Sequence, residues 1–301
     1  MTVLGIAVFS VSNALGKYFV TRYPLGEILL LRSAAAFLCL GPFLRGRDVV
    51  ASLARGQLAL QVIRMVLVAT ELVCFYLSVS TLPLAAVSTF YLAVPIYVLV
   101  LSAVFLRERV AARRWVAALV GLVGVLVALR PGVAAVAGVG RAEAICIFGS
   151  LCYSVILTLT RRLRGTAGTV LVAWQLTGVL ALGAGWSTLH FVWPGPIDLA
   201  ALAAIGLITM TGYAGVNRGL QLAPASLVAP FQYTSIVWAT LTGFLVFGEV
   251  PKATTIMGAA IIIGAGLFLL FAERATYPRL APTAKLEAAA PAGDRETARR
   301  L

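Results

Sequence analysis

The chain is built from long apolar stretches separated by short polar segments. Ten such stretches can be traced, at about 2–20, 25–44, 58–80, 84–106, 111–130, 142–160, 168–190, 197–217, 224–248 and 252–272. A helix of about twenty residues, rising 1.5 Å per residue, covers the roughly 30 Å hydrocarbon core of a bilayer. The apolar residues are continuous rather than alternating, which favours helices over membrane strands. The pattern therefore predicts ten transmembrane helices.

Composition agrees with a multi-pass membrane protein. Of the 301 residues, 61% are hydrophobic and only 12% are charged, and the mean hydropathy is +0.98. A soluble domain carries about 25% charged residues. The first stretch begins at Met1 without a basic segment before it, so we expect a retained helix rather than a cleaved signal peptide. Residues 274–301 are rich in Ala, Pro, Arg and Glu and are expected to form a disordered cytoplasmic tail.

The net charge of +13 is distributed in a way that indicates orientation. Ten spans place both termini on one side of the membrane. With a cytoplasmic N-terminus, seventeen Lys and Arg residues fall in inner segments and five in outer segments. This is the bias of the positive-inside rule. We therefore expect a membrane protein with cytoplasmic termini and no nucleic-acid partner.

Two parts of the chain, residues 82–110 and 223–251, resemble each other at a constant offset. The offset of 141 positions aligns Pro83 with Pro224, Phe90 with Phe231, Tyr97 with Trp238 and Glu108 with Glu249. A repeat of five spans is odd, so the second repeat must enter the membrane inverted. The turn RERVAARR carries four arginines, whereas its counterpart GEVPKATT carries one lysine. We expect an all-α fold of two five-helix inverted-topology repeats, 1–137 and 138–273, around a central cavity.

Several motifs carry a family resemblance. They are the run Leu82-Pro83, the span that ends FLRERV, the following helix WVAALVGLVGVLVALRPG, and Arg32 early in the second helix. With five plus five helices, the chain resembles the drug/metabolite transporter superfamily, EamA type, over about residues 1–273. Within it, the chain is most similar to the YddG-type bacterial exporters of aromatic and neutral amino acids. The second repeat departs from the pattern at FGEVP, which lacks the usual aliphatic residue before its acid.

The resemblance implies a secondary transporter that exports small organic solutes through a central cavity by alternating access. Neutral or aromatic amino acids are the substrates expected first, and other small solutes or drugs are the alternative. The chain has no G-x-x-x-x-G-K-[ST] loop, so transport would be facilitated or proton-linked rather than driven by ATP. We expect a monomer, with a dimer as the alternative.

Two other functions fit the sequence less well. An intramembrane enzyme needs a nucleophile with a base, or a metal site, and the chain has a single histidine, His190, and no H-E-x-x-H motif. A channel needs a continuous polar pore, whereas polar residues are sparse here. The cysteines lack metal-ligand spacing and are expected to act as small apolar residues: Cys39, Cys74, Cys146 and Cys152. We therefore expect no enzyme activity, no cofactor and no metal.

Glu71 is an acidic residue deep within the third apolar stretch. A charge near the bilayer centre costs about 2.5–3.5 kcal/mol on insertion scales, so protein contacts, water or a proton must offset it. Arg32 lies roughly 10 Å from the outer surface and Glu71 roughly 13 Å, on consecutive antiparallel helices. We predict that the two pair or share water, either as a structural clamp or with Glu71 as a cavity group. Arg64, two turns before Glu71, can instead reach the cytoplasmic surface.

Polar and aromatic side chains recur at helical spacing in several spans, which places them against protein or water rather than lipid. Tyr97 and Trp238 occupy equivalent mid-span positions, where they would either pack in the core or accept an apolar substrate side chain. Pro95 and Pro230 interrupt their spans and predict kinks, either static or part of a gate. The residues expected in the cavity are Asn13, Glu71, Tyr76, Tyr91, Tyr97, Tyr153, Tyr213, Asn217, Gln232 and Trp238.

Overall fold

The computed structural model describes residues 1–20, 22–53, 55–81, 87, 90–91, 93–108, 110–129, 140–188, 191–238, 241 and 253–276. The expected tail from residue 277, the boundary between the two repeats near 137, and Pro83, His190 and Glu249 lie outside these ranges. Within them the ordered elements are all helical. The prediction of an all-helical protein is confirmed for this part of the chain.

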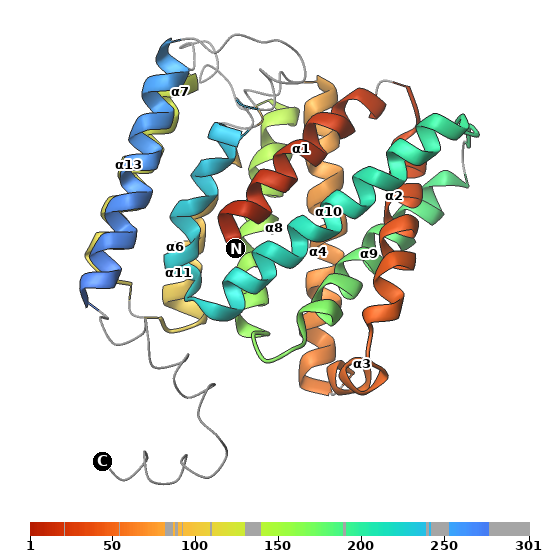
Figure 1. The fold of residues 1–301 in the computed structure, drawn as a ribbon, viewed down its shortest axis with the longest axis horizontal. Coiled ribbons are helices and arrows are strands. Elements are labelled where there is room, and N and C mark those ends of the chain that lie inside the picture. The colour runs from red at the N-terminus through yellow and green to blue at the C-terminus, as the bar shows by residue number, and fades with distance from the viewer. Residues whose placement is uncertain are drawn as a thin grey trace, which may run out of the picture.

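Eight long helices dominate the fold (Figure 1). They are α1 (Thr2–Val20), α2 (Leu25–Leu40), α4 (Arg55–Thr81), α7 (Ala112–Leu129), α8 (Arg141–Arg162), α9 (Gly168–Ser187), α10 (Pro196–Leu222) and α13 (Ala253–Thr276). The short elements are η1 (Gly41–Phe43), α3 (Gly46–Ser52), α6 (Val94–Phe105), α11 (Ala225–Val228) and η3 (Ala229–Tyr233). In the described part of the chain, six helices are long and apolar enough to cross a membrane, namely α1, α2, α4, α8, α9 and α10.

In the described residues, the fourth and ninth apolar stretches are broken next to Pro95 and Pro230, the two positions where the sequence predicts kinks. α6 begins at Val94 with Pro95 in its first turn, where the missing N–H leaves no helical carbonyl unpaired. The ninth stretch starts as the single turn α11, tightens into a 3-10 helix around Pro230, and resumes as α-helix at 234–238. Proline removes a backbone donor, which is the physical cause of both breaks. The two helices resume within one residue of equivalent repeat positions.

Helices from the first 130 residues pack mainly against helices from the rest of the chain. α7 lies along α13 at one flank, α2 against α9, α1 across α10, and α4 beside α8 (Figure 1). Further contacts join α10 with α2 and α4 with α9. These pairs are symmetric between the two halves of the chain. If α1 exchanges places with α8, α2 with α9, α4 with α10 and α7 with α13, each of these pairs becomes itself or another of these pairs. A two-fold relation between the two halves produces this pattern.

Glycine allows two of these helices to approach closely. A Cβ atom added at Gly206 of α10 would overlap the backbone carbonyl group of Arg32 in α2. Only glycine fits there without moving a backbone, as is common where membrane helices pack. The crossing therefore also fixes the position of Arg32 relative to α10.

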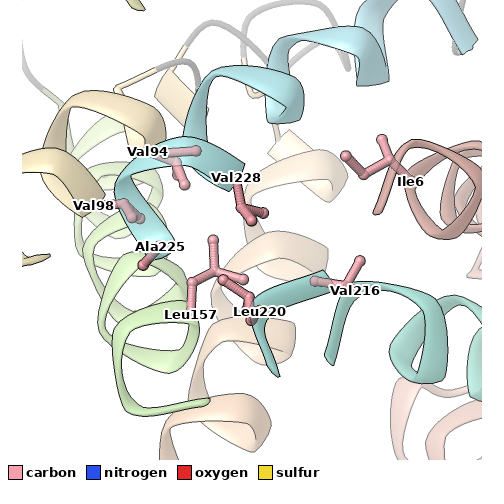
Figure 2. Close-up of a cluster of buried hydrophobic side chains, with 9 residues drawn as sticks. Ile6, Val94, Val98, Leu157, Val216, Leu220, Ala225 and Val228 are labelled. Carbon is pink, nitrogen blue, oxygen red and sulfur yellow. The ribbon is translucent and has the colours of Figure 1, made fainter. Parts of the chain in front are cut away.

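An apolar cluster fills the junction of α1, α6, α8, α10 and α11 (Figure 2). Its buried members are Ile6, Val94, Val98, Leu157, Val216, Leu220, Ala225, Val228 and Ala229. Tyr91, Tyr153 and Trp238 pack against its edge. The cluster borders the chamber described next, because Leu157 and Val216 also line that chamber.

Candidate functional site

A narrow chamber lies among α4, α8, α9 and α10, with Phe9 of α1 at its edge. Its lining residues are Phe9, Val68, Glu71, Tyr153, Ile156, Leu157, Thr160, Gln175, Tyr213, Val216 and Asn217. The chamber volume is about 20 Å³, which is room for about one water molecule. Pockets for small organic ligands have volumes of about 300–1,000 Å³. The surrounding helices must therefore move apart before the chamber can hold a metabolite.

Four of the ten predicted cavity residues line this chamber: Glu71, Tyr153, Tyr213 and Asn217. The Asn217 side chain donates from Nδ2 to Oε1 of Gln175 at 2.8 Å, which joins α10 to α9. Both amides are buried. Sequence reasoning missed Gln175, although a glutamine in the middle of an apolar span was the available signal.

Glu71 and Arg32 do not form the direct ion pair that the sequence suggested. Glu71 Oε1 accepts a hydrogen bond from Tyr91 Oη at 3.1 Å, and Arg32 Nη1 donates to Tyr76 Oη at 3.3 Å. Among the described residues, the ion pair found joins Glu108 to Arg161 instead. Glu71 and Arg32 thus each form a hydrogen bond with a tyrosine hydroxyl rather than with each other.

Gln232, Trp238 and Tyr97 are not among the chamber-lining residues of the described chain. Gln232 Oε1 accepts a hydrogen bond at 3.4 Å from the hydroxyl group of Tyr153, which lines the chamber. Trp238 packs at the edge of the apolar cluster of Figure 2. For these three residues the expected lining position is not observed in this conformation.

Asn13 is exposed on α1 and is not among the residues that line this chamber. The preceding residue faces inward instead: Ser12 Oγ lies 2.6 Å from Thr209 Oγ1 of α10. One residue turns a helix by about 100°, so Ser12 rather than Asn13 reaches the α1–α10 contact.

Arg64 does not reach the surface, contrary to expectation. Its side chain has 0% exposure. Nη1 donates to Thr160 Oγ1 at 3.1 Å, and Nη2 donates to the backbone carbonyl of Leu171. Because Thr160 lines the chamber, the guanidinium lies one hydrogen bond behind the chamber wall. The spacing of Gln61, Arg64 and Glu71 on one helical face was the sequence signal for this position.

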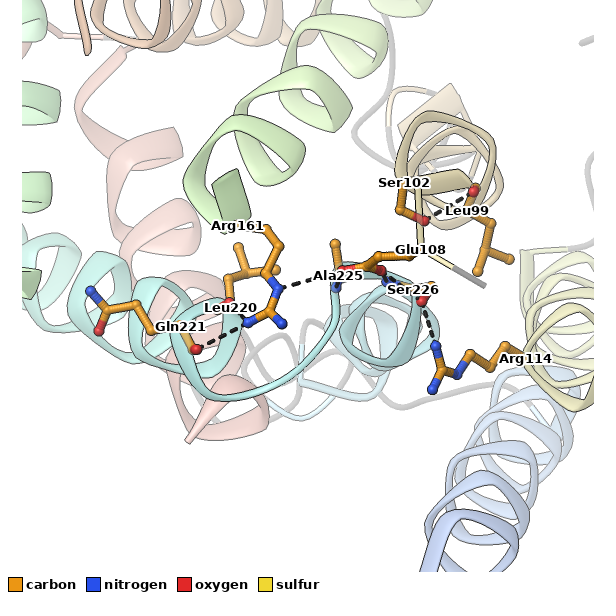
Figure 3. Close-up of polar contacts among 9 residues, drawn as sticks. All are labelled: Leu99, Ser102, Glu108, Arg114, Arg161, Leu220, Gln221, Ala225 and Ser226. Carbon is orange, nitrogen blue, oxygen red and sulfur yellow. Dashed lines mark hydrogen bonds and ion pairs between the residues drawn. The ribbon is translucent and has the colours of Figure 1, made fainter. Parts of the chain in front are cut away.

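A polar cluster, which we term the clasp, joins one end of several helices (Figure 3). Glu108, just after α6, pairs with Arg161 at the end of α8, with 3.4 Å between Oε1 and Nε. Glu108 also accepts hydrogen bonds from the backbone N–H groups of Ala225 and Ser226, each at 3.3 Å, and from Ser226 Oγ at 2.9 Å. The carboxylate thus satisfies free donors at the start of α11.

The two arginines of the clasp extend it to α10 and α7. Arg161 Nη1 donates to the carbonyls of Leu220 and Gln221 at the end of α10, each at 3.0 Å. Arg114 Nη1 at the start of α7 donates to Ser226 Oγ at 2.7 Å. A cation at a helix C-terminus and an anion at an N-terminus are both stabilising. The clasp therefore ties together the ends of five helices.

The part of the chain that the structure describes contains no set of side chains suited to bind a metal ion. No group of three or more His, Cys, Asp or Glu side chains there could hold a metal ion. The four cysteines are unpaired, and three of them are buried.

Comparison with known proteins gives matches along nearly the whole chain. Residues 1–130 and 141–272 each match the EamA-like transporter family. The pseudopaline exporter CntI of Pseudomonas aeruginosa is 30% identical over 274 residues, which cover 89% of this chain and 94% of that protein. The riboflavin transporter of Rhizobium johnstonii is 26% identical, with coverages of 90% and 89%. The S-adenosylmethionine uptake transporter of Rickettsia felis is 21% identical, with coverages of 92% and 93%.

A solved crystal structure shares the fold. Its TM-score is 0.72 at 20% sequence identity, and the match covers 91% of this chain and 98% of the other. The names of the three relatives include export as well as uptake, and three different solutes. The narrower resemblance to YddG-type amino-acid exporters is therefore not supported by these relatives.

Proposed function

Since the chain belongs to the EamA-like transporter family and is thus a small-molecule transporter, we propose that it exports neutral or aromatic amino acids. Transport would cross the bacterial inner membrane without ATP. Other small polar solutes are the alternative, because the relatives act on chemically different solutes.

The observation that carries this proposal is the composition of the chamber wall. Glu71 offers a carboxylate whose one hydrogen-bonded partner in the described chain is the neutral Tyr91, so it can receive a substrate ammonium. Apolar side chains such as Phe9 and Ile156 face the same space and suit an uncharged substrate side chain. A buried carboxylate is costly in a membrane helix, which favours a functional role over an accidental one.

Alternating access is the mechanism we propose. The exchange symmetry of the helix pairs supports two repeats that swap roles, as in transporters with inverted repeats. The clasp supports the same topology, because it gathers at one end the helix ends that ten spans would place in the cytoplasm. The breaks at Pro95 and Pro230 are candidate hinges. Glu71 is also the acid best placed to carry a proton.

The test is counterflow in proteoliposomes. Vesicles loaded with unlabelled L-phenylalanine should take up radiolabelled L-phenylalanine faster than empty vesicles, and uptake should saturate. A panel of other labelled amino acids and of riboflavin ranks the substrates. Flux that rises without saturation would indicate a channel, and counterflow of riboflavin but of no amino acid would replace the amino-acid assignment by the alternative.

A further inference from the structure

We infer that Arg64 and Gln61 form a carboxylate-binding subsite at the end of the chamber opposite Glu71, so that the transported solute carries a carboxylate group. The inference rests on the proposed function and adds to it the chemical class of the substrate.

Arg64 is a buried cation that forms no ion pair with an acid of the described chain. Its side chain has 0% exposure, and its two hydrogen-bond acceptors there, Thr160 Oγ1 and the Leu171 carbonyl, are neutral. The Nε atom has no hydrogen-bond partner among the described residues. Neutral acceptors satisfy donors but leave the charge uncompensated, and an uncompensated buried charge is strongly destabilising.

Gln61 adds an independent observation at the same place. Its side chain also has 0% exposure, and neither Oε1 nor Nε2 has a hydrogen-bond partner in the described part of the chain. Residues three apart share a helix face, so Gln61 and Arg64 present unused donors side by side. Buried polar groups are normally paired. Two unsatisfied groups together indicate that a ligand completes them.

The chamber gives a ligand access to this pair. Thr160 lines the chamber and accepts the hydrogen bond of Arg64 Nη1. Val68, one helical turn after Arg64, lines it as well. When the helices separate, a ligand carboxylate in the chamber can replace Thr160 as the acceptor from Nη1 and also accept from the second N–H of Nη2, which donates one hydrogen bond in the described chain. Nε with Nη2 is the other pair of arginine N–H groups that points the same way, and such bidentate contacts are the strong ones that arginine forms with a carboxylate.

Glu71 and Arg64 then define a dipolar site along α4. They lie seven residues apart on one face, about 10 Å along the helix axis. Allowing about 3 Å for each hydrogen bond, a ligand spans them if its ammonium and carboxylate are a few ångströms apart. An amino acid would bind with its ammonium towards Glu71 and its carboxylate towards Arg64. An amine without a carboxylate would lose one end of the site.

The rival explanation is that Arg64 has a purely structural role and only connects α4 to α8 and α9. Binding selectivity separates the two roles, because the loss of a structural contact would weaken the binding of all ligands equally. The purified protein in detergent is titrated with three probes that differ only at their charged groups: L-phenylalanine, L-phenylalaninamide and 3-phenylpropanoate. We expect the wild type to bind L-phenylalanine about tenfold or more tightly than the amide, since a charged hydrogen bond supplies that ratio.

In Arg64→Gln the ratio should fall to about one through loss of L-phenylalanine and 3-phenylpropanoate affinity, with the amide retained. Arg64→Lys, which keeps the charge without the bidentate geometry, should give an intermediate ratio. Gln61→Leu removes an unpaired amide and should fold at least as well as the wild type, while lowering the ratio by a few-fold. The Gln61→Leu variant therefore still tests the subsite if the Arg64→Gln variant does not fold.

Three results would overturn the subsite: no preference for the carboxylate in the wild type, no binding of any of the probes, or equal losses of all three in folded Arg64→Gln. Counterflow of L-phenylalanine in a protein without carboxylate preference would defeat this inference and leave the proposed function intact. Selective 3-phenylpropanoate binding without counterflow would support the subsite and defeat the proposed function.

Discussion

Two ionisable side chains of opposite sign share the buried face of α4, and neighbouring neutral groups hold each of them in place. Glu71 accepts from Tyr91, and Arg64 donates to Thr160 and to the Leu171 carbonyl. Neutral partners satisfy the hydrogen-bonding groups of these side chains but do not neutralise their charges, so both side chains can still interact with a charged ligand. This separates the two from Arg161 and Glu108, which pair with each other.

Replacing Glu71 by glutamine tests the role of its charge. Glu71→Gln keeps the size of the side chain and an oxygen that accepts from Tyr91, so we expect a folded protein with an unfolding temperature equal to or above that of the wild type. Counterflow of L-phenylalanine should fall about tenfold or more, because the substrate ammonium loses a charged partner. Tyr91→Phe is the matched control, since it removes the hydrogen bond and retains the carboxylate. A folded Glu71→Gln protein with normal counterflow would make Glu71 purely structural.

At the level of helices, close backbone approach and capped helix ends hold the bundle together. Gly206 brings α10 against the backbone of α2 at Arg32. At one end of the bundle, the clasp joins α6, α7, α8, α10 and α11 through Glu108, Ser226 and the two arginines of the cluster (Figure 3). The first contact sets the spacing of these two helices, and the second ties the helix ends together.

The helix crossing can be tested with a single methyl group. Gly206→Ala should lower the free energy of unfolding by about 1–3 kcal/mol, because the added Cβ overlaps the Arg32 carbonyl group and overpacking costs about that much. Gly185→Ala, also within a helix, adds the same methyl where nothing lies within 4 Å. It should be neutral or slightly stabilising, since alanine favours helix over glycine. Equal thermal stability of the two variants would show that the crossing tolerates a wider spacing.

The clasp is best tested by a double-mutant cycle. Glu108→Gln should lower the free energy of unfolding by about 1.5–3 kcal/mol, because it weakens hydrogen bonds to a charged group at a partly buried site. The Glu108→Gln and Arg161→Gln changes should be non-additive by more than about 0.5 kcal/mol. Arg162→Gln changes the adjacent, exposed arginine and is the control. Additive effects, or an effect of Arg162→Gln as large as that of Arg161→Gln, would mean that the ion pair contributes no coupling.

Across the whole molecule, the two halves of the chain are interleaved rather than side by side. Each long helix of the first half has its main partner in the second, as in α2 with α9 and α7 with α13. A chamber wall built from α4 together with α8, α9 and α10 therefore changes whenever one half moves against the other. This arrangement favours alternating access over a fixed pore.

Inversion of the halves can be tested with two engineered cysteines in a background without native cysteines. Gly46, after α2, and Gly195, before α10, both have open space around an added Cβ. They occupy corresponding turns of the two halves. A membrane-impermeant thiol reagent added to intact cells should label Gly195→Cys and leave Gly46→Cys unlabelled. Labelling of both, or of Gly46→Cys alone, would contradict the inverted topology.

Much of the fold follows from the sequence because a bilayer demands continuous apolar helices, so helices such as α1 and α8 lie where they were expected. Which face each helix buries was harder to predict. Asn13 was assigned to the cavity, whereas in the structure Asn13 is exposed and Ser12 makes the contact with α10. Arg64 was expected at the surface because a long side chain can snorkel. Only the structure shows that α8 and α9 enclose it.

Solute binding in the chamber bounded by Glu71 and Thr160 can be tested by substrate protection. Thr160→Cys, in the background without native cysteines, places a thiol on the chamber wall, and Gly195→Cys provides a thiol outside the chamber lining. Saturating L-phenylalanine should slow alkylation of Thr160→Cys by N-ethylmaleimide and leave the rate for Gly195→Cys unchanged. If a transported solute at saturation leaves the alkylation rate of Thr160→Cys unaltered, the solute binds elsewhere and the chamber is not the binding site.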